Sequence, residues 1–136
     1  MIEIEHTAHS PKPRSEVWNK LSDLESWHAW GPWKRTELEG DIRTMVSERR
    51  KLHGRSYVLK EKVTALVPEE RFEYDLLSGL PVKNYHATVT LTDADGGGTD
   101  IHWASHFDPP WGIVGGLWRG AMLKVITEVS EALAKA

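Results

Sequence analysis

The sequence contains no cysteine and no long apolar run, and these absences exclude several classes of protein. Without cysteine there is no disulfide framework and no thiolate for catalysis or metal binding, which is typical of cytoplasmic proteins. No segment approaches the ~20 apolar residues that cross a bilayer. Residues 1–8 alternate polar with apolar and lack the basic start and apolar block of a secretion signal. We therefore expect a cytoplasmic protein with no membrane span.

The chain also has no excess of positive charge. Its 17 Lys and Arg residues against 20 Asp and Glu give a formal net charge of -3. Binding to phosphate backbones needs clustered cations, so we do not expect nucleic acid as a partner. The basic residues at 49–51 stand between glutamates and indicate a solvated strand end. The length of 136 residues fits one domain, residues 1–136, with a core that needs no disulfide or metal.

Apolar periodicity predicts an α+β chain with strands in its middle and helices near its ends. Residues 2–8 alternate as a strand, after which Pro13 or Arg14 begins a helix. A second short helix, which contains Leu24, Trp27 and Trp30, ends at Gly31 and Pro32. Six further strands are predicted at residues 33–39, 43–52, 55–66, 71–78, 82–93 and 99–108. The connections between these strands are short, which favours antiparallel neighbours.

Residues 114–136 are predicted to form one amphipathic helix that covers the whole sheet. Its apolar residues recur at the helical spacing and are Val114, Leu117, Trp118, Ala121, Met122, Val125, Ile126, Val129 and Leu133. A helix only ~10 Å wide does not fill a strongly curved sheet, so we expect a cavity between them. Gly115, Gly116 and Gly120 in the first turns indicate a hinged lid. Leu123 lies opposite the apolar stripe and is a candidate contact in a homodimer.

The last hairpin predicts which side chains face the cavity. We pair Ala87, Val89 and Leu91 with Phe107, Ser105 and Trp103 across a three-residue loop at 96–98. The same alternation puts the threonines of residues 88–92 and the histidines of residues 102–106 on an outer, solvated face.

The predicted inner surface is rich in aromatic side chains. The candidate ligand-binding residues are Trp30, Tyr57, Tyr74, Tyr85, Trp103, Phe107, Trp118 and Met122. Such a lining suits an apolar or aromatic ligand held by few hydrogen bonds. Packing in an ordinary core is the alternative interpretation of each of these residues.

His6 and Glu61 are the ionisable residues predicted to point inward, and they are the candidate catalytic residues. A carboxylate at an inward strand position costs several kcal/mol unless it is paired, hydrated or protonated. Glu61 therefore either opens onto a wet cavity or meets an inward arginine, and Arg35 and Arg49 are the nearby candidates. His6 is either a hydrogen-bonded core histidine or a group that reads the ligand or transfers protons.

Metal and cofactor motifs are not found. His102 and His106 are ~13 Å apart on a strand, too far to share one zinc ion. The aspartates at 93–95 lack the late glutamate of a calcium loop. The glycines at 96–98 precede a strand, so no helix N-terminus cradles a phosphate there. We expect no metal and no cofactor.

Three segments together resemble a known family. They are residues 15–23 with Trp27 and Trp30 after them, residues 63–72, and residues 98–103. The chain resembles the helix-grip fold of the SRPBCC superfamily, which includes lipid-transfer START domains and pollen-allergen-like carriers, and it is most similar to the polyketide cyclase/dehydrase family. The resemblance implies a curved antiparallel seven-stranded sheet wrapped around a long C-terminal helix, with two short helices after strand 1. It also implies a deep cavity for lipids, sterols, polyketides or other bulky hydrophobic molecules.

Three functions remain open. The leading hypothesis is a protein that binds a small hydrophobic molecule between the sheet and the C-terminal helix. The alternative is a polyketide cyclase/dehydrase-type enzyme in which His6, Glu61 or a tyrosine transfers protons. The resemblance transfers no catalytic residue to this chain. The third is a protein-interaction module that uses the outer surface or Leu123.

Overall fold

The structure is a computed structural model that describes residues 1–47, 58–110 and 115–136. Its elements in chain order are β1 Ile2–Ser10, α1 Arg14–Ser22, the 3-10 helix η1 Trp27–Ala29, β2 Trp33–Glu39, β3 Ile42–Ser47, β4 Val58–Val67, β5 Arg71–Ser78, β6 Lys83–Asp93, β7 Thr99–Asp108 and α2 Gly115–Lys135. The predicted order of elements is confirmed, although the second short helix is a single 3-10 turn. The parts of the predicted strands at 43–52 and 55–66 that fall within 48–57 lie outside the described residues.

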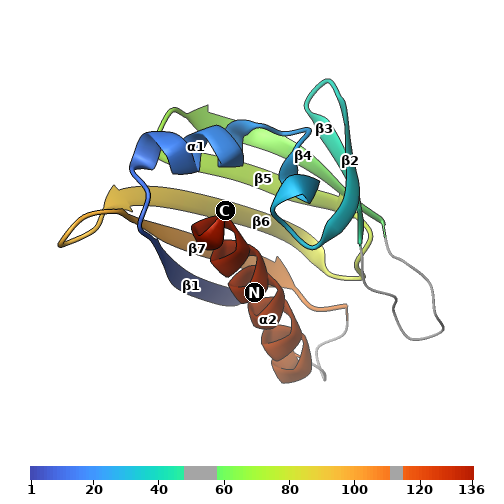
Figure 1. Ribbon diagram of the computed structural model, residues 1–136. Helices are drawn as coiled ribbons and strands as arrows, with labels where there is room; N and C mark the ends of the chain where they lie inside the picture. The colour runs from blue at the N-terminus through green and yellow to red at the C-terminus, as the bar shows by residue number, and fades with distance from the viewer. Residues whose placement is uncertain (48–57, 111–114) are drawn as a thin grey trace.

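The seven strands form one antiparallel sheet in the order β1-β7-β6-β5-β4-β3-β2. Figure 1 shows the helices on one side of this sheet, with α2 beside β1 and β7 and with α1 nearer the opposite end. The polar side chains of β6 and β7 lie on the other side, as the alternation predicted. This arrangement is the expected helix-grip fold.

The register of the last hairpin differs from the prediction by two residues. Ala87 pairs with Ser105 and Val89 with Trp103, and the loop after Asp93 has five residues instead of three. A shift of two residues keeps every side chain on its face, so the inner and outer sets were assigned correctly. Gly98 has φ +85, and a Cβ there would lie 2.2 Å from the carbonyl oxygen of Ser10, so the loop packs against the end of β1 only with glycine.

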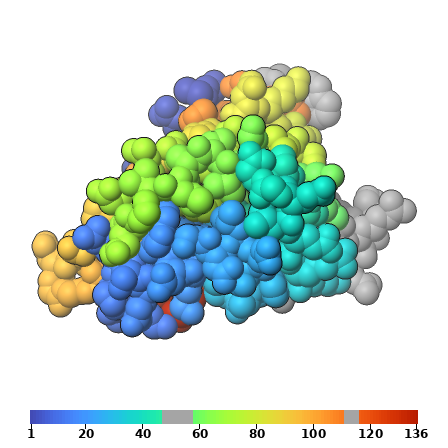
Figure 2. Space-filling model, turned by 90° about the horizontal axis from the view of Figure 1, so that it is seen from above, coloured from blue at the N-terminus to red at the C-terminus, as the bar shows by residue number. Residues whose placement is uncertain are grey.

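The inner face of the sheet is covered by three helical segments, which corrects the expectation that one helix covers it all. α2 packs on β1 and β7, α1 packs on β6, and η1 packs on β2. In Figure 2 the atoms of α1 and η1, in blue, lie directly beside those of β2 and β3, in cyan. Trp27 of η1 is buried, and its ring centroid lies 5.0–6.2 Å from those of Trp30, Trp33, Phe72, Tyr74 and Trp103. This indole therefore occupies space that we had assigned to a ligand.

Burial of the apolar stripe of α2 increases toward its C-terminal part. Met122, Ile126 and Leu133 are buried, but Leu117 is 75% exposed. In the first turns of the helix, Trp118 is half-buried against the core. Leu123 is half-buried against the core instead of lying opposite the stripe, so its predicted position was wrong.

Candidate functional site

A cavity lies between α2, η1 and the inner face of the sheet. Its lining is almost wholly aromatic and aliphatic, and consists of Trp27, Trp33, Leu59, Glu61, Tyr74, Leu76, Leu80, Tyr85, Trp103, Met122, Val125, Ile126 and Val129. The volume is about 30 Å³. A water molecule needs roughly 10–15 Å³ by this measure, whereas small-molecule sites enclose roughly 300–1,000 Å³. The interior is therefore nearly filled in this conformation, and buried Trp27 is one of the side chains that fill it.

The predicted ligand-binding residues divide into two groups in the structure. Tyr74, Tyr85, Trp103 and Met122 line the interior cavity. Phe107 is buried behind the cavity, with its ring stacked 6.2 Å from that of Tyr85. Trp30 and Trp118 are half-buried and do not line it. Tyr57 lies outside the described residues.

Glu61 meets an inward arginine, but a different one from the two we considered. It is the direct cross-strand neighbour of Arg43, and the Nη2 atom of Arg43 donates to its Oε1 atom at 2.5 Å. Arg35 is exposed and lies 3.5 Å from Glu37, and Arg49 lies outside the described residues. The available signal was the alternation of β3, because Arg43 stands two residues before the buried Met45 and must share its face.

Burial controls the ionisation of this pair. Arg43 is fully buried and the side chain of Glu61 is 6% exposed. Desolvation raises the pKa of Glu61, and the charge and hydrogen bond of Arg43 only partly oppose this rise. Because Glu61 lines the cavity, a molecule that enters the cavity meets a carboxyl group with an increased affinity for protons.

Trp27 separates Arg43 from the cavity. The guanidinium carbon of Arg43 lies 3.5 Å from the centroid of the Trp27 ring, a cation–π contact in a dry environment. The indole Nε1 of Trp27 donates to the Leu21 carbonyl at 2.8 Å. The indole of Trp27 is thus held by the guanidinium of Arg43 on its face and by a hydrogen bond to the Leu21 carbonyl of α1 at its edge. Sequence reasoning had assigned Trp27 to a short helix without seeing that it fills the interior.

Two tyrosine hydroxyls complete the polar part of the lining. The hydroxyl of Tyr85 lies 2.9 Å from that of Ser105. Burial raises the pKa of Tyr85 to about 12 and raises the pKa of Tyr74 as well. Both phenols are therefore neutral at physiological pH and act as hydrogen-bonding groups.

His6 is not brought to the cavity. It lies on the face of β1 that turns toward α2, as predicted, and is half-buried there. Its Nε2 atom lies 3.6 Å from a carboxylate oxygen of Glu131 on α2. The structure thus places His6 at the contact between β1 and α2, apart from Glu61.

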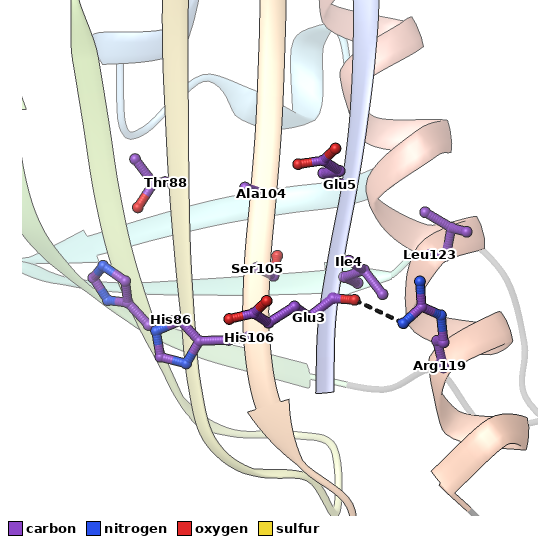
Figure 3. A pocket seen from close by; sticks show the side chains of 10 residues that line it. All are labelled: Glu3, Ile4, Glu5, His86, Thr88, Ala104, Ser105, His106, Arg119 and Leu123. Carbon is purple, nitrogen blue, oxygen red and sulfur yellow. Dashed lines mark hydrogen bonds between the residues drawn. The ribbon is translucent and has the colours of Figure 1, made fainter. Parts of the chain in front are cut away.

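A second hollow, of about 530 Å³, lies on the outer face of the sheet and reaches around β1 to α2 (Figure 3). Its wall is polar: the rings of His86 and His106 lie 5.6 Å apart, and Arg119 donates to the Glu3 carbonyl at 3.0 Å. Both ring nitrogens of His86 contact carboxylates on β5. Within the described parts of the chain, no three His, Asp or Glu residues are placed to hold a metal ion.

The fold and the interior cavity define a helix-grip domain, and comparison with known proteins identifies the family. The sequence matches the family described as "Polyketide cyclase / dehydrase and lipid transport" over residues 1–136. The chain therefore belongs to the polyketide cyclase/dehydrase and lipid transport family. No curated protein matches it.

Solved structures with low sequence identity share the fold. XoxI from Bacillus cereus has 16% identity and a TM-score of 0.85, covering 99% of this chain and 94% of that one. A protein from Thermobifida fusca has 19% identity and a TM-score of 0.79, covering 98% and 91%. A START superfamily protein from Mycobacterium smegmatis has 14% identity and a TM-score of 0.72, covering 98% and 97%. At these identities the likeness concerns the fold alone.

The helices give no sign of a membrane span. Among residues 1–47, 58–110 and 115–136, none of them combines the length and the apolar character needed to cross a bilayer.

Proposed function

We propose that this protein binds a small, largely hydrophobic molecule in the interior cavity between the sheet and α2. The observation that carries the proposal is the lining itself, in which aromatic and aliphatic side chains from five strands and two helical segments surround a single carboxyl group. This combination of an apolar wall with few polar groups is typical of small-molecule sites. The description of the family, which includes lipid transport, agrees with it.

Binding requires the interior to widen, and α2 is the element that moves. A cavity of about 30 Å³ admits no aromatic ligand unless a wall is displaced. The first turns of α2 are held by Trp118 and by the hydrogen bond from Arg119 to the Glu3 carbonyl, while Leu117 is 75% exposed and a Cβ at Gly116 or Gly120 would have no neighbour within 4 Å. Outward movement of this end separates Met122 and Val125 from Tyr74 and Tyr85 without breaking the sheet.

Titration with the neutral fluorescent probe N-phenyl-1-naphthylamine tests the proposal. We expect saturable binding with increased fluorescence, because the probe enters an apolar and water-poor site. Native mass spectrometry of protein purified from its own source should also show a retained small molecule. Absence of both signals would refute the proposed function.

Matched variants on α2 locate the site. Met122→Phe enlarges a side chain that lines the cavity, and we expect it to abolish binding of the probe. Leu117→Phe makes a similar change on the exposed part of the same helix and should leave binding unchanged. Equal binding by both variants would place the site elsewhere.

A second candidate function is enzymatic, and the position of Glu61 favours it. A carboxylate whose pKa is raised by burial is a stronger base than one in water and suits removal of a proton from carbon next to a carbonyl group. The proton would pass from carbon to Glu61, leaving an enolate, and then return to the product. Deuterium uptake at the methyl group of 2-acetylnaphthalene, followed by NMR, tests this role. Uptake at the uncatalysed rate, or equal uptake with Glu61→Gln, would contradict it.

A further inference from the structure

One tryptophan of the cavity wall carries a buried hydrogen-bond donor that has no acceptor among the described residues. Trp103 is 1% exposed and lines the interior cavity. Its indole Nε1 atom is buried and has no hydrogen-bond partner in the part of the chain that the structure describes. An indole N–H donates and never accepts, so only a group with a lone pair satisfies it.

The neighbouring indole of Trp27, which also lines the cavity, has an acceptor for its N–H group. Its Nε1 atom is also buried, but it donates to the Leu21 carbonyl at 2.8 Å. The unpaired nitrogens of Arg43 are a different case, because its guanidinium lies over the face of Trp27 and does not line the cavity. Trp103 is thus the cavity-lining residue whose indole N–H has no acceptor among the described residues. An unused buried donor is unfavourable unless a bound molecule supplies the acceptor.

We propose that the molecule bound in the interior is an aromatic or polycyclic compound with an uncharged acceptor oxygen, such as a ketone or quinone, and that this oxygen accepts a hydrogen bond from Nε1 of Trp103. The inference rests on the proposed function, since it assumes that the interior is the ligand site. It goes further by naming the ligand class and the residue that selects it.

The carboxyl group of Glu61 limits the charge that a ligand in this cavity can carry. This carboxyl group lines the same cavity, whereas its partner Arg43 is already paired with it at 2.5 Å and is covered by Trp27. An anionic ligand would therefore enter a dry site that contains a carboxyl group and no free cation in the described lining, which is strongly unfavourable. The site consequently discriminates against free carboxylic acids, including fatty acids.

Three probes of nearly the same shape test the inference by equilibrium dialysis at pH 7. They are 2-acetylnaphthalene, 2-isopropenylnaphthalene, in which a methylene group replaces the carbonyl oxygen, and 2-naphthoate. We expect the ketone to bind about tenfold more tightly than the alkene, the factor that corresponds to one net hydrogen bond. The carboxylate should bind more weakly than the ketone, and Glu61→Gln should reduce that difference.

Two tryptophan variants assign the preference to one donor. Trp103→Phe keeps an aromatic ring but removes the N–H, and the preference for ketone over alkene should disappear. Trp30→Phe removes an indole N–H that is also unpaired but lies outside the cavity lining, and the preference should persist. In the unaltered protein, the ¹⁵N–¹H indole resonance of Trp103 should move downfield with the ketone and not with the alkene. This readout does not depend on whether Trp103→Phe folds.

The outcomes separate the inference from the proposed function. Equal binding of ketone and alkene to the unaltered protein, with both displaced by N-phenyl-1-naphthylamine, would overturn the inference and leave the proposed function standing. An indole resonance that does not respond to the ketone would also overturn it. Failure of all four compounds to bind would reject the proposed function and the inference together.

Discussion

Two glutamates on neighbouring strands lie on opposite faces of the sheet and have different cationic partners. Glu61 on β4 points inward and pairs with Arg43, whereas Glu73 on β5 points outward and pairs with His86. Burial raises the pKa of Glu61 despite its partner. The hydrogen bond from His86 lowers the pKa of Glu73, because water still reaches that carboxylate. Desolvation therefore has the larger effect on the pKa at the buried pair, and the hydrogen bond has the larger effect at the solvated pair.

The same contrast separates the outer hollow from the interior cavity. The outer hollow is larger, but both ring nitrogens of its His86 already contact carboxylates, and its Glu5 lies 3.3 Å from His102. The inner one is small, but it contains a carboxyl group and an indole N–H in an apolar wall. Polar groups in a dry wall discriminate between ligands far better than the same groups in water.

The largest expected effect is the loss of Arg43. Arg43→Met leaves Glu61 buried without a partner, and we expect the free energy of unfolding to fall by about 3–5 kcal/mol at pH 7. The pKa of Glu61 is raised in the folded state, so its contribution to stability is greatest below the unfolded pKa and is lost as pH rises through the folded pKa. The loss in the variant should accordingly be smaller at pH 5, as urea unfolding at both pH values would show.

Two further variants serve as controls for this prediction. Arg35→Met removes an exposed arginine from the adjacent strand, and stability should change by less than ~0.5 kcal/mol. The double variant Arg43→Met with Glu61→Leu should be more stable than Arg43→Met alone, since no charge stays buried. A loss in Arg35→Met equal to that in Arg43→Met would contradict the contrast between the two faces.

The next effect concerns packing beneath α2. Met122 is 3% exposed, and Met122→Ala should lower the free energy of unfolding by about 2–3 kcal/mol while it enlarges the cavity. Leu117→Ala on the exposed turn of the same helix is the control and should be nearly neutral. Chemical denaturation measures both. A neutral Met122→Ala would mean that α2 does not pack on the sheet in solution.

A smaller effect is expected on the outer face. Burial disfavours the charged form of His86, but hydrogen bonds with Asp75 and Glu73 outweigh it and raise the pKa of His86. The charged ring therefore stabilises the fold below pH 6.5, and this contribution is lost as pH rises through the folded pKa. His86→Gln should lower stability by about 1 kcal/mol at pH 6, and by less at pH 9.

Glu73, the carboxylate partner of His86, sets the lower limit of the pH range in which the pair stabilises the fold. Glu73 has a lowered pKa, so its contribution is present above the unfolded pKa of 4.5 and is lost as pH falls through the folded pKa. Thermal unfolding between pH 4 and pH 9 should give the smallest difference between wild type and His86→Gln at the two ends of this range. A difference independent of pH would exclude an ionic role for His86.

The smallest effect is expected for the exposed pair of Glu5 and His102. Their side chains are 74% and 42% exposed and lie 3.3 Å apart. Solvent and salt screen such a pair, so Glu5→Gln should change stability by less than ~0.5 kcal/mol. The same assay measures this variant. A larger loss would show that the outer face is more dehydrated than its exposure indicates.

Much of the site was predictable because alternation along strands is a local property. The inward position of Glu61, Tyr74, Tyr85 and Trp103 followed from period-two patterning, and it survived a register error of two residues. The partner of Glu61 was not predicted, because cross-strand pairing depends on where β3 and β4 meet, and nothing local to either strand encodes that position.

The fold class, the order of the elements and the face of each strand residue were determined by the sequence alone, since they depend on the spacing of apolar side chains and on where turns interrupt it. The size of the cavity was decided only by the tertiary structure. Trp27 belongs to a short segment without strong periodicity, and its insertion between Arg43 and the aromatic cluster depends on contacts among residues distant in the chain. Long-range packing of this kind also left the indole N–H of Trp103, in the cavity wall, without a partner among the described residues.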